Sequence, residues 1–140
     1  MSAYKSGAAS PKTNEVMFKD LGLNFIPHPV TKKLPILKNE NAIKRAVRNL
    51  ILTNNYERFY NPYFGGNITS YLFENFSPIT KASIEKRIKD TVEVYEPRVD
   101  LLEVKVQQRD ERNELTVDIT FRPKNQIQQS QLSFTVERIR

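Results

Sequence analysis

The hydrophobic pattern of this chain changes its period at Pro97, and this change restricts the possible folds more than any other feature. In the expected helices before Pro97, apolar residues recur at every third or fourth position, which places them on one face of an α-helix. After Pro97, apolar and polar residues alternate, which is typical of a strand with one buried and one solvated face. Because helices precede strands and do not alternate with them, the sequence predicts an α+β fold.

Three alternating runs follow Pro97, separated by polar turns at 108–113 and 122–130. They predict a C-terminal antiparallel β-meander of three strands, with the last strand at a sheet edge. The apolar residues expected on the buried face are Leu102, Val104, Val106, Leu115, Val117, Ile119, Phe121, Leu132, Phe134 and Val136.

About three helices are expected before the meander. Asn39 can cap a helix that runs to about Thr53, and Thr80 can cap a helix that ends before Pro97. A short helix is expected between them, from about 67 to 75. The buried faces would be formed by Ile43, Ala46, Val47, Leu50 and Ile51 in the first helix and by Ile84, Ile88, Val92 and Tyr95 in the last.

The beginning of the chain lacks such periodicity. Residues 1–17 are rich in Ser, Ala, Lys and Pro, so we expect an extended, flexible N-terminal arm. Residues 18–140 are predicted to form a single domain. Within it, prolines forbid a helix over 18–31 and predict an extended chain or edge strand, and 32–38 reads as a basic connector.

The net charge of +6 is unevenly distributed. Residues 1–50 contain 9 Lys and Arg against 3 Asp and Glu, whereas residues 51–140 contain 13 of each. This neutral second part argues against a small basic nucleic-acid-binding protein. The basic side chains of the first part form either a solvated surface or a contact face for an acidic protein, made of Lys32, Lys33, Lys44, Arg45 and Arg48.

Eight of the 14 aromatic residues lie between Tyr56 and Phe76, where only Arg58 is basic. Without a basic track, core packing or a protein interface is favoured over stacking on bases. The chain has no Cys and one His, His28, so neither a cofactor nor a metal site is expected. No apolar run has the length of a membrane span, and no secretory leader is recognisable. Together with the absence of Cys, this predicts a protein that is made and used in a reducing cytoplasm, or assembled there.

Two alternatives remain open for the carboxylates and for the last strand. Glu74, Glu85, Glu93 and Glu96 could supply a hydrolytic pair, but nothing in their spacing sets two of them across a cleft, so an enzyme is not expected. The last strand either ends the fold simply or offers its edge to a strand of another chain.

Glu96-Pro97-Arg98 stands where the last helix gives way to the first strand of the meander. In an extended chain, Glu96 and Arg98 project to the same side and can form a preorganised charged claw. The simpler interpretation is a helix terminator with an internal ion pair.

Several segments, read together, resemble one known family. The segments are 18–21, 28–31, 40–45, 49–53, 57–65, 72–75 and 95–99. Over about residues 16–140 their order and content resemble the baseplate wedge, or sheath-initiator, family of contractile-tail phages. This family is typified by gene product twenty-five, carries an old lysozyme label and has relatives in type VI secretion baseplates.

The resemblance implies a structural role in the virion tail baseplate, assembled in the bacterial host cytoplasm. Six copies around the tail axis would link other wedge core proteins to the tail sheath and lie near the tail tube, without membrane or specific nucleic acid. Glu96, Pro97 and Arg98 would dock on the wedge core. The last strand would template the first sheath ring by β-augmentation, through Gln131, Leu132, Ser133, Phe134, Thr135, Val136 and Glu137. The alternative that the family label keeps open is a peptidoglycan-degrading tail lysozyme.

Overall fold

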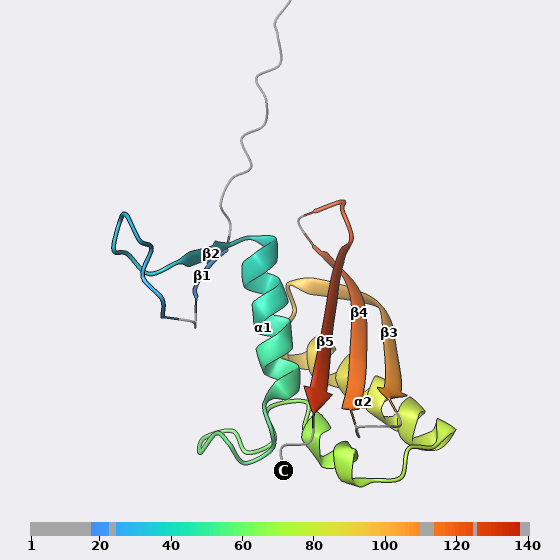
Figure 1. Ribbon diagram of the computed structural model, residues 1–140. Helices are drawn as coiled ribbons and strands as arrows, with labels where there is room; N and C mark the ends of the chain where they lie inside the picture. Colours follow the sequence, from blue (N-terminus) through green and yellow to red (C-terminus); the bar gives the residue numbers. More distant parts are fainter. Residues whose placement is uncertain (1–17, 23–24, 110–113, 125, 138–140) are drawn as a thin grey trace, which may run out of the picture.

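The computed structural model describes residues 18–22, 25–109, 114–124 and 126–137. Two α-helices and a 3₁₀-helix precede a three-stranded sheet, which confirms the α+β prediction (Figure 1). The predicted arm, residues 1–17, lies outside the described residues. In chain order the elements are β1 (Lys19–Leu21), β2 (Ile36–Lys38), α1 (Glu40–Leu52), η1 (Ile68–Phe73), α2 (Pro78–Tyr95), β3 (Val99–Arg109), β4 (Glu114–Pro123) and β5 (Ser130–Glu137).

The meander is an antiparallel sheet in the order β3-β4-β5. Helix α2 packs against β3, and α1 lies along β5, so the helices and the sheet form two layers (Figure 1). The interface between the layers is the core, and Ile43, Ile88 and Phe121 are among its fully buried side chains. Burying an apolar side chain of this size stabilises the fold by about 1.5–3 kcal/mol.

The first strand of the meander departs from the predicted alternation. The register shifts between Leu101 and Glu103, so Leu102 is left without a partner in β4. This irregularity turns Leu102 outward, where 46% of it is exposed, while Leu101 packs against the core. The prediction that Leu102 belongs to the buried face was therefore wrong, whereas Val106 is fully buried as expected.

The helix caps also differ from the sequence-based prediction. Helix α2 begins at Pro78, and Ser77 is its N-cap, because the Ser77 hydroxyl accepts a hydrogen bond from the Thr80 N–H at 3.1 Å. The cap expected at Thr80 was wrong. Asn39 does occupy the N-cap of α1, but its side chain accepts from the Phe18 N–H at 3.3 Å and so ties the first strand to the helix.

A two-stranded hairpin precedes α1. β1 lies in the segment predicted to be extended, and β2 lies in the segment predicted to be a basic connector. Gly22 N–H donates to the Pro35 carbonyl at 2.8 Å, and Asn39 N–H donates to the Phe18 carbonyl at 2.8 Å. Strands of three residues give little periodicity, which is why β2 had no recognisable pattern.

Candidate functional site

The outer edge of β5 faces away from the rest of the sheet. Among the described residues, β5 pairs with β4 alone. Just beyond β4, Lys124 N–H donates to the Arg98 carbonyl at 3.0 Å, so even-numbered residues along β4 direct their backbone groups toward β3. Odd-numbered residues of β4 therefore bond to β5, where their register partners are even-numbered, as in the pair Val117 and Phe134. The odd-numbered residues of β5 consequently point their N–H and C=O groups outward.

This edge contains the segment that the sequence suggested for strand exchange. The outward backbone groups belong to Gln131, Ser133, Thr135 and Glu137, and all four residues are exposed. Their neighbours Phe134 and Val136 are buried in the core, and Leu132 is half-buried. The alternation along the sequence identified the two faces of β5. It could not identify the outward backbone groups, because these depend on the register with β4.

Glu96 and Arg98 form a bidentate ion pair. Arg98 donates from Nε to Glu96 Oε1 at 2.5 Å and from Nη2 to Oε2 at 2.6 Å. The Glu96 N–H donates to the Val92 carbonyl at 2.9 Å, so the carboxylate is held at the end of α2. The charged claw therefore exists as an intramolecular pair, with both residues on one side of the chain.

The pair is buried at one end and open at the other. The Glu96 side chain is 8% exposed, whereas the Arg98 side chain is 40% exposed. The hydrogen bonds to Glu96 raise the pKa of Arg98 above its usual value, and the charge of Asp20 adds to this effect. Arg98 Cζ also lies 5.2 Å from the centre of the Phe18 ring. The arrangement presents a fixed, half-exposed guanidinium whose remaining N–H groups can reach a partner.

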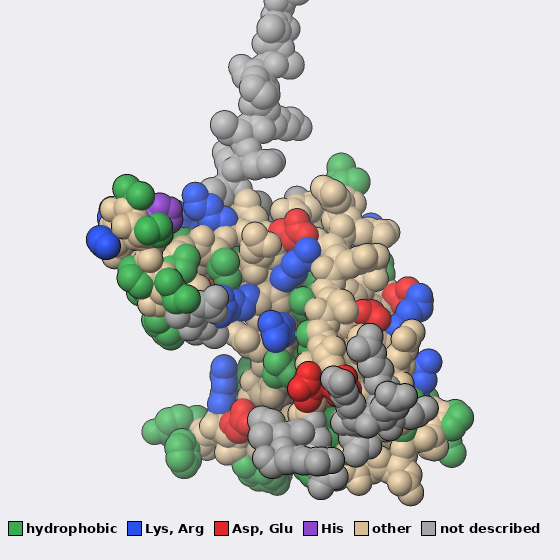
Figure 2. All heavy atoms as spheres, viewed as in Figure 1, with side chains coloured by type: hydrophobic (Ala, Val, Ile, Leu, Met, Phe, Trp, Pro, Cys, Tyr) green, Lys and Arg blue, Asp and Glu red, His purple; other side chains and the backbone are tan. Residues whose placement is uncertain are grey.

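Three of the five predicted basic residues come together beside β5. A hollow of about 560 Å³ is lined by Leu37, Asn41, Lys44, Arg45, Arg48, Asn49, Leu52 and Leu132. Figure 2 shows Lys and Arg side chains along α1, next to the sheet. Lys32 and Lys33 do not line this hollow, since they lie exposed in the loop between β1 and β2.

Glu40 stabilises the beginning of α1 next to this hollow. Its Oε1 is 2.7 Å from Lys44 Nζ. Hydrogen bonds from Lys44 and from the Ser130 hydroxyl hold the pKa of Glu40 below its usual value. Because Ser130 is the first residue of β5, the Glu40 carboxylate lies near the start of the edge strand.

The aromatic segment divides into a packed part and an exposed part. Phe64, Tyr71 and Phe76 pack against the core. Phe59 and Tyr60 lie at the tip of the loop between α1 and η1 and are fully exposed. Sequence reasoning favoured core packing or an interface for the whole segment. It could not separate the two parts, since their residue types are the same.

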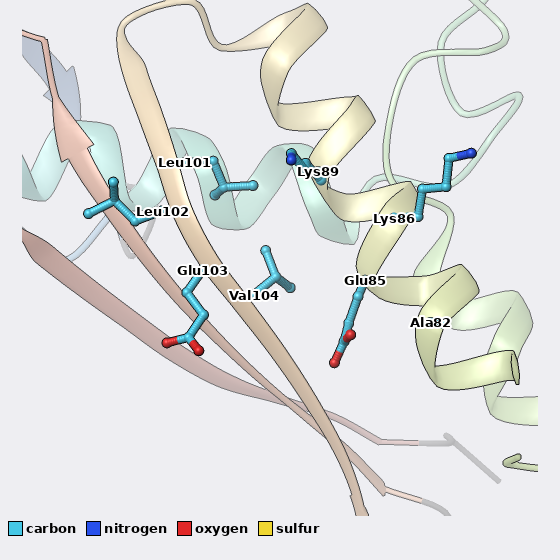
Figure 3. A pocket seen from close by; sticks show the side chains of 8 residues that line it. All are labelled: Ala82, Glu85, Lys86, Lys89, Leu101, Leu102, Glu103 and Val104. Carbon is cyan, nitrogen blue, oxygen red and sulfur yellow. The ribbon is translucent and has the colours of Figure 1, made fainter. Parts of the chain in front are cut away.

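Three of the four carboxylates considered for hydrolysis, Glu85, Glu93 and Glu96, have partners within the chain. A hollow of about 330 Å³ between α2 and β3 is lined by two of the chain's carboxylates (Figure 3). Glu85 Oε1 accepts from the Val106 N–H at 3.1 Å, and Glu103 Oε1 lies 3.0 Å from Lys105 Nζ. Glu85 ties α2 to β3, whereas the Glu103–Lys105 pair lies exposed on β3.

The other candidates do not add a site. Glu93 Oε1 lies 3.9 Å from Lys89 Nζ, Glu96 binds Arg98, and Glu74 is exposed after η1. Within the described ranges, no group of three or more His, Cys, Asp and Glu could hold a metal ion. In the same part of the chain, no helix has the length and apolar character needed to cross a membrane.

Comparison with known sequences gives one family. The sequence pattern of the family described as Baseplate wedge protein gp25 matches residues 38–136. Baseplate wedge protein gp25 of Enterobacteria phage T4 is 36% identical over 80 residues. That match covers 57% of this chain and 61% of the phage protein, so it spans less than two thirds of the relative.

Solved structures share the fold. A candidate tail lysozyme from Geobacter sulfurreducens gives a TM-score of 0.61 at 28% identity, over 68% of this chain and 86% of the other. A chain of the anti-feeding prophage baseplate gives a TM-score of 0.59 at 19% identity, and the match covers 84% of this chain and 83% of the other. A chain of the type VI secretion system baseplate complex gives a TM-score of 0.57 at 15% identity, and the match covers 66% of this chain and 88% of the other.

The family match extends from β2 through both α-helices and nearly the whole of β5, so it includes the edge strand and the Glu96–Arg98 pair. It confirms the family expected from the sequence resemblance. The chain belongs to the family of baseplate wedge protein gp25.

Proposed function

We propose that this chain is a structural component of a contractile-tail baseplate wedge. In this role it lies in the tail baseplate, links the baseplate core to the tail sheath and templates the first sheath ring through β5. Family membership and the fold shared with chains of two other baseplates support the baseplate role. The proposal assigns no residue to catalysis, because three of the four candidate carboxylates, Glu85, Glu93 and Glu96, bind other groups of the chain.

The proposed contact with the sheath is supported by the edge of β5, whose backbone N–H and C=O groups point away from β4. An edge with N–H and C=O groups directed to solvent is able to add a strand from another chain. Such an addition extends an existing antiparallel sheet without unfolding any part of it. The core residues Phe134 and Val136 keep β5 in place while its edge is used.

Proline substitution on this edge tests the proposal. In the double variant Ser133→Pro/Thr135→Pro, two outward N–H donors are lost, while the hydrogen bonds to β4 remain because they use the even-numbered residues. We expect particles assembled with this variant to contain baseplates but no sheath. Deleting residues 131–140 would be a poorer test, since it removes Phe134 and Val136 from the core.

The matched control is Ser133→Ala/Thr135→Ala, which changes the same side chains and keeps both N–H groups. This control is expected to form sheaths normally. Normal sheaths on a folded, baseplate-bound proline variant would contradict templating by β5.

The second proposed contact is with other wedge core proteins, through Arg98. Glu96 is too buried to reach a partner directly, so it acts as a positioning residue for the guanidinium. Pro97 holds the turn that sets the two side chains next to each other. A carboxylate or a row of carbonyl groups on the partner would match the remaining N–H groups of Arg98.

A further inference from the structure

We propose that the strand which docks on β5 carries acidic side chains on the face that it turns toward α1. This inference rests on the proposed function and names the chemistry of the strand that the edge selects. The observation that supports this inference is the hollow beside β5, in which Lys44, Arg45 and Arg48 lie next to Leu132.

The hollow lies where an added strand would run. Its lining residues come from β2, α1 and β5, and none of them belongs to β3 or β4. Helix α1 contacts β5, and Figure 1 shows the two side by side. Since neighbouring strands are about 4.8 Å apart, a strand paired with the free edge of β5 would pass along the exposed side of α1.

Strand alternation decides which side chains of the added strand enter the hollow. Leu132 belongs to the same alternating set as Phe134 and Val136, which point toward the helices. Residues that are directly opposite in an antiparallel pair point to the same face. The residue opposite Leu132, and every second residue from it, would therefore face α1.

The hollow has an excess of positive charge. Lys44 is paired with Glu40 at 2.7 Å. In the described part of the chain, no carboxylate lies within ion-pair distance of Arg45 or Arg48. An added strand would remove water from these guanidinium groups, and carboxylates on its inner face would replace the lost hydrogen bonds.

The hollow also has an apolar part. Leu37, Leu52 and Leu132 contribute to its lining. The inner face of the strand therefore matches the hollow best when acidic side chains are combined with aliphatic ones. A strand with lysines at the same positions would be repelled by Arg45 and Arg48.

A tethered strand tests this preference. The full chain is extended after Arg140 by a flexible Gly/Ser linker and a strand of about nine residues, long enough to run back along β5. One strand alternates Thr with Glu and Val, and its matched partner has Lys in place of Glu. Both fusions are made in the wild-type chain and in Arg45→Glu/Arg48→Glu, and each variant is first shown to fold without the added strand.

Two readouts separate strand addition from charge selection. Hydrogen exchange at the amides of Ser133 and Thr135 reports strand addition, and thermal unfolding reports its relative stability. We expect the acidic strand to protect both amides and to melt about 4 °C higher than the Lys strand. In Arg45→Glu/Arg48→Glu the order is expected to reverse.

The control Lys86→Glu/Lys89→Glu makes the same change of charge on α2, beside the other hollow. This control is expected to keep the preference for the acidic strand. If the preference reversed in the control as well, it would follow from the net charge of the protein and not from the hollow beside β5, and the inference would be overturned. Equal protection and equal melting temperatures for the two strands would overturn it as well, while leaving β5 as an acceptor edge. Protection of neither amide in any fusion would contradict strand addition itself, and with it the proposed function.

Discussion

Pro97 ends α2 and begins β3 within a few residues, which leaves Glu96 and Arg98 on the same side of the chain. The sequence predicted that the two side chains would meet, but the structure brings them together through a turn at Pro97 and Arg98 and not through an extended chain. The sequence could not indicate that Glu96 would be buried and Arg98 half-exposed. Exposure depends on tertiary packing, such as the approach of Arg98 Cζ to within 5.2 Å of the centre of the Phe18 ring.

Docking through this pair gives the first prediction at the residue scale. Arg98→Ala is expected to weaken binding to wedge core proteins by about 2–5 kcal/mol if the guanidinium is desolvated in the contact. Glu96→Gln is expected to weaken binding less, since it removes the positioning charge and leaves the guanidinium. Both are measured by pull-down and titration, with the free energy of unfolding determined in parallel.

The matched control is Arg122→Ala, which removes an exposed arginine from an ion pair with Asp100. This variant is expected to bind as the wild type does. If Arg98→Ala binds as tightly as the wild type, the Glu96–Arg98 pair takes no part in docking and is only an internal ion pair at the end of a helix.

Glu40 gives a second prediction at this scale. Because its pKa in the folded chain lies below the usual value of 4.5, the carboxylate contributes stability above pH 4.5. That contribution is lost as the pH falls through the lowered pKa. In urea titrations, Glu40→Gln is therefore expected to be less stable than the wild type near neutral pH, and the difference is expected to shrink in acid. The exposed carboxylate Glu74 supplies the control Glu74→Gln, and a difference independent of pH would refute the assignment.

At the scale of elements, the sequence predicted periodic segments well and short ones poorly. The strict alternation along β4 identified the four buried residues from Leu115 to Phe121. In β3 the register shift displaced Leu102, because a bulge is set by pairing with the neighbouring strand and leaves no mark in the pattern. β2 was missed because its partner β1 is distant in sequence and both are short. The hollow between α1 and β5 could not be foreseen, since it depends on tertiary packing.

Gly65 and Gly66, which precede η1, are both buried. Gly66 N–H donates to the Leu50 carbonyl at 3.1 Å, and a Cβ on Gly66 would lie 2.6 Å from the Ile51 carbonyl oxygen. The loop therefore runs directly against the end of α1, and only glycine permits this approach.

Gly66→Ala is accordingly expected to lower the free energy of unfolding by about 2 kcal/mol, because the new methyl group meets backbone atoms that cannot move aside. Chemical denaturation measures the change. Glu74→Ala, an exposed substitution on the same connection, is expected to have little effect. A stability of Gly66→Ala equal to that of the wild type would show that the end of α1 yields easily.

At the scale of the whole molecule, the two proposed contacts lie on different parts of the fold. The Glu96–Arg98 pair lies where α2 meets β3, and the free edge belongs to β5, with β4 between the two strands (Figure 1). One chain can therefore contact the wedge core and a sheath strand at the same time. The same two-layer core holds both surfaces, so their relative position is fixed by packing.

The central claim is that a strand of the sheath extends this sheet at β5. Electron cryo-microscopy of an assembled tail, at a resolution that separates strands, tests it most directly. The account predicts a fourth strand hydrogen-bonded to Ser133 and Thr135, with its inner face over α1. A first sheath ring that contacts the chain elsewhere, with the edge of β5 open to solvent, would contradict it.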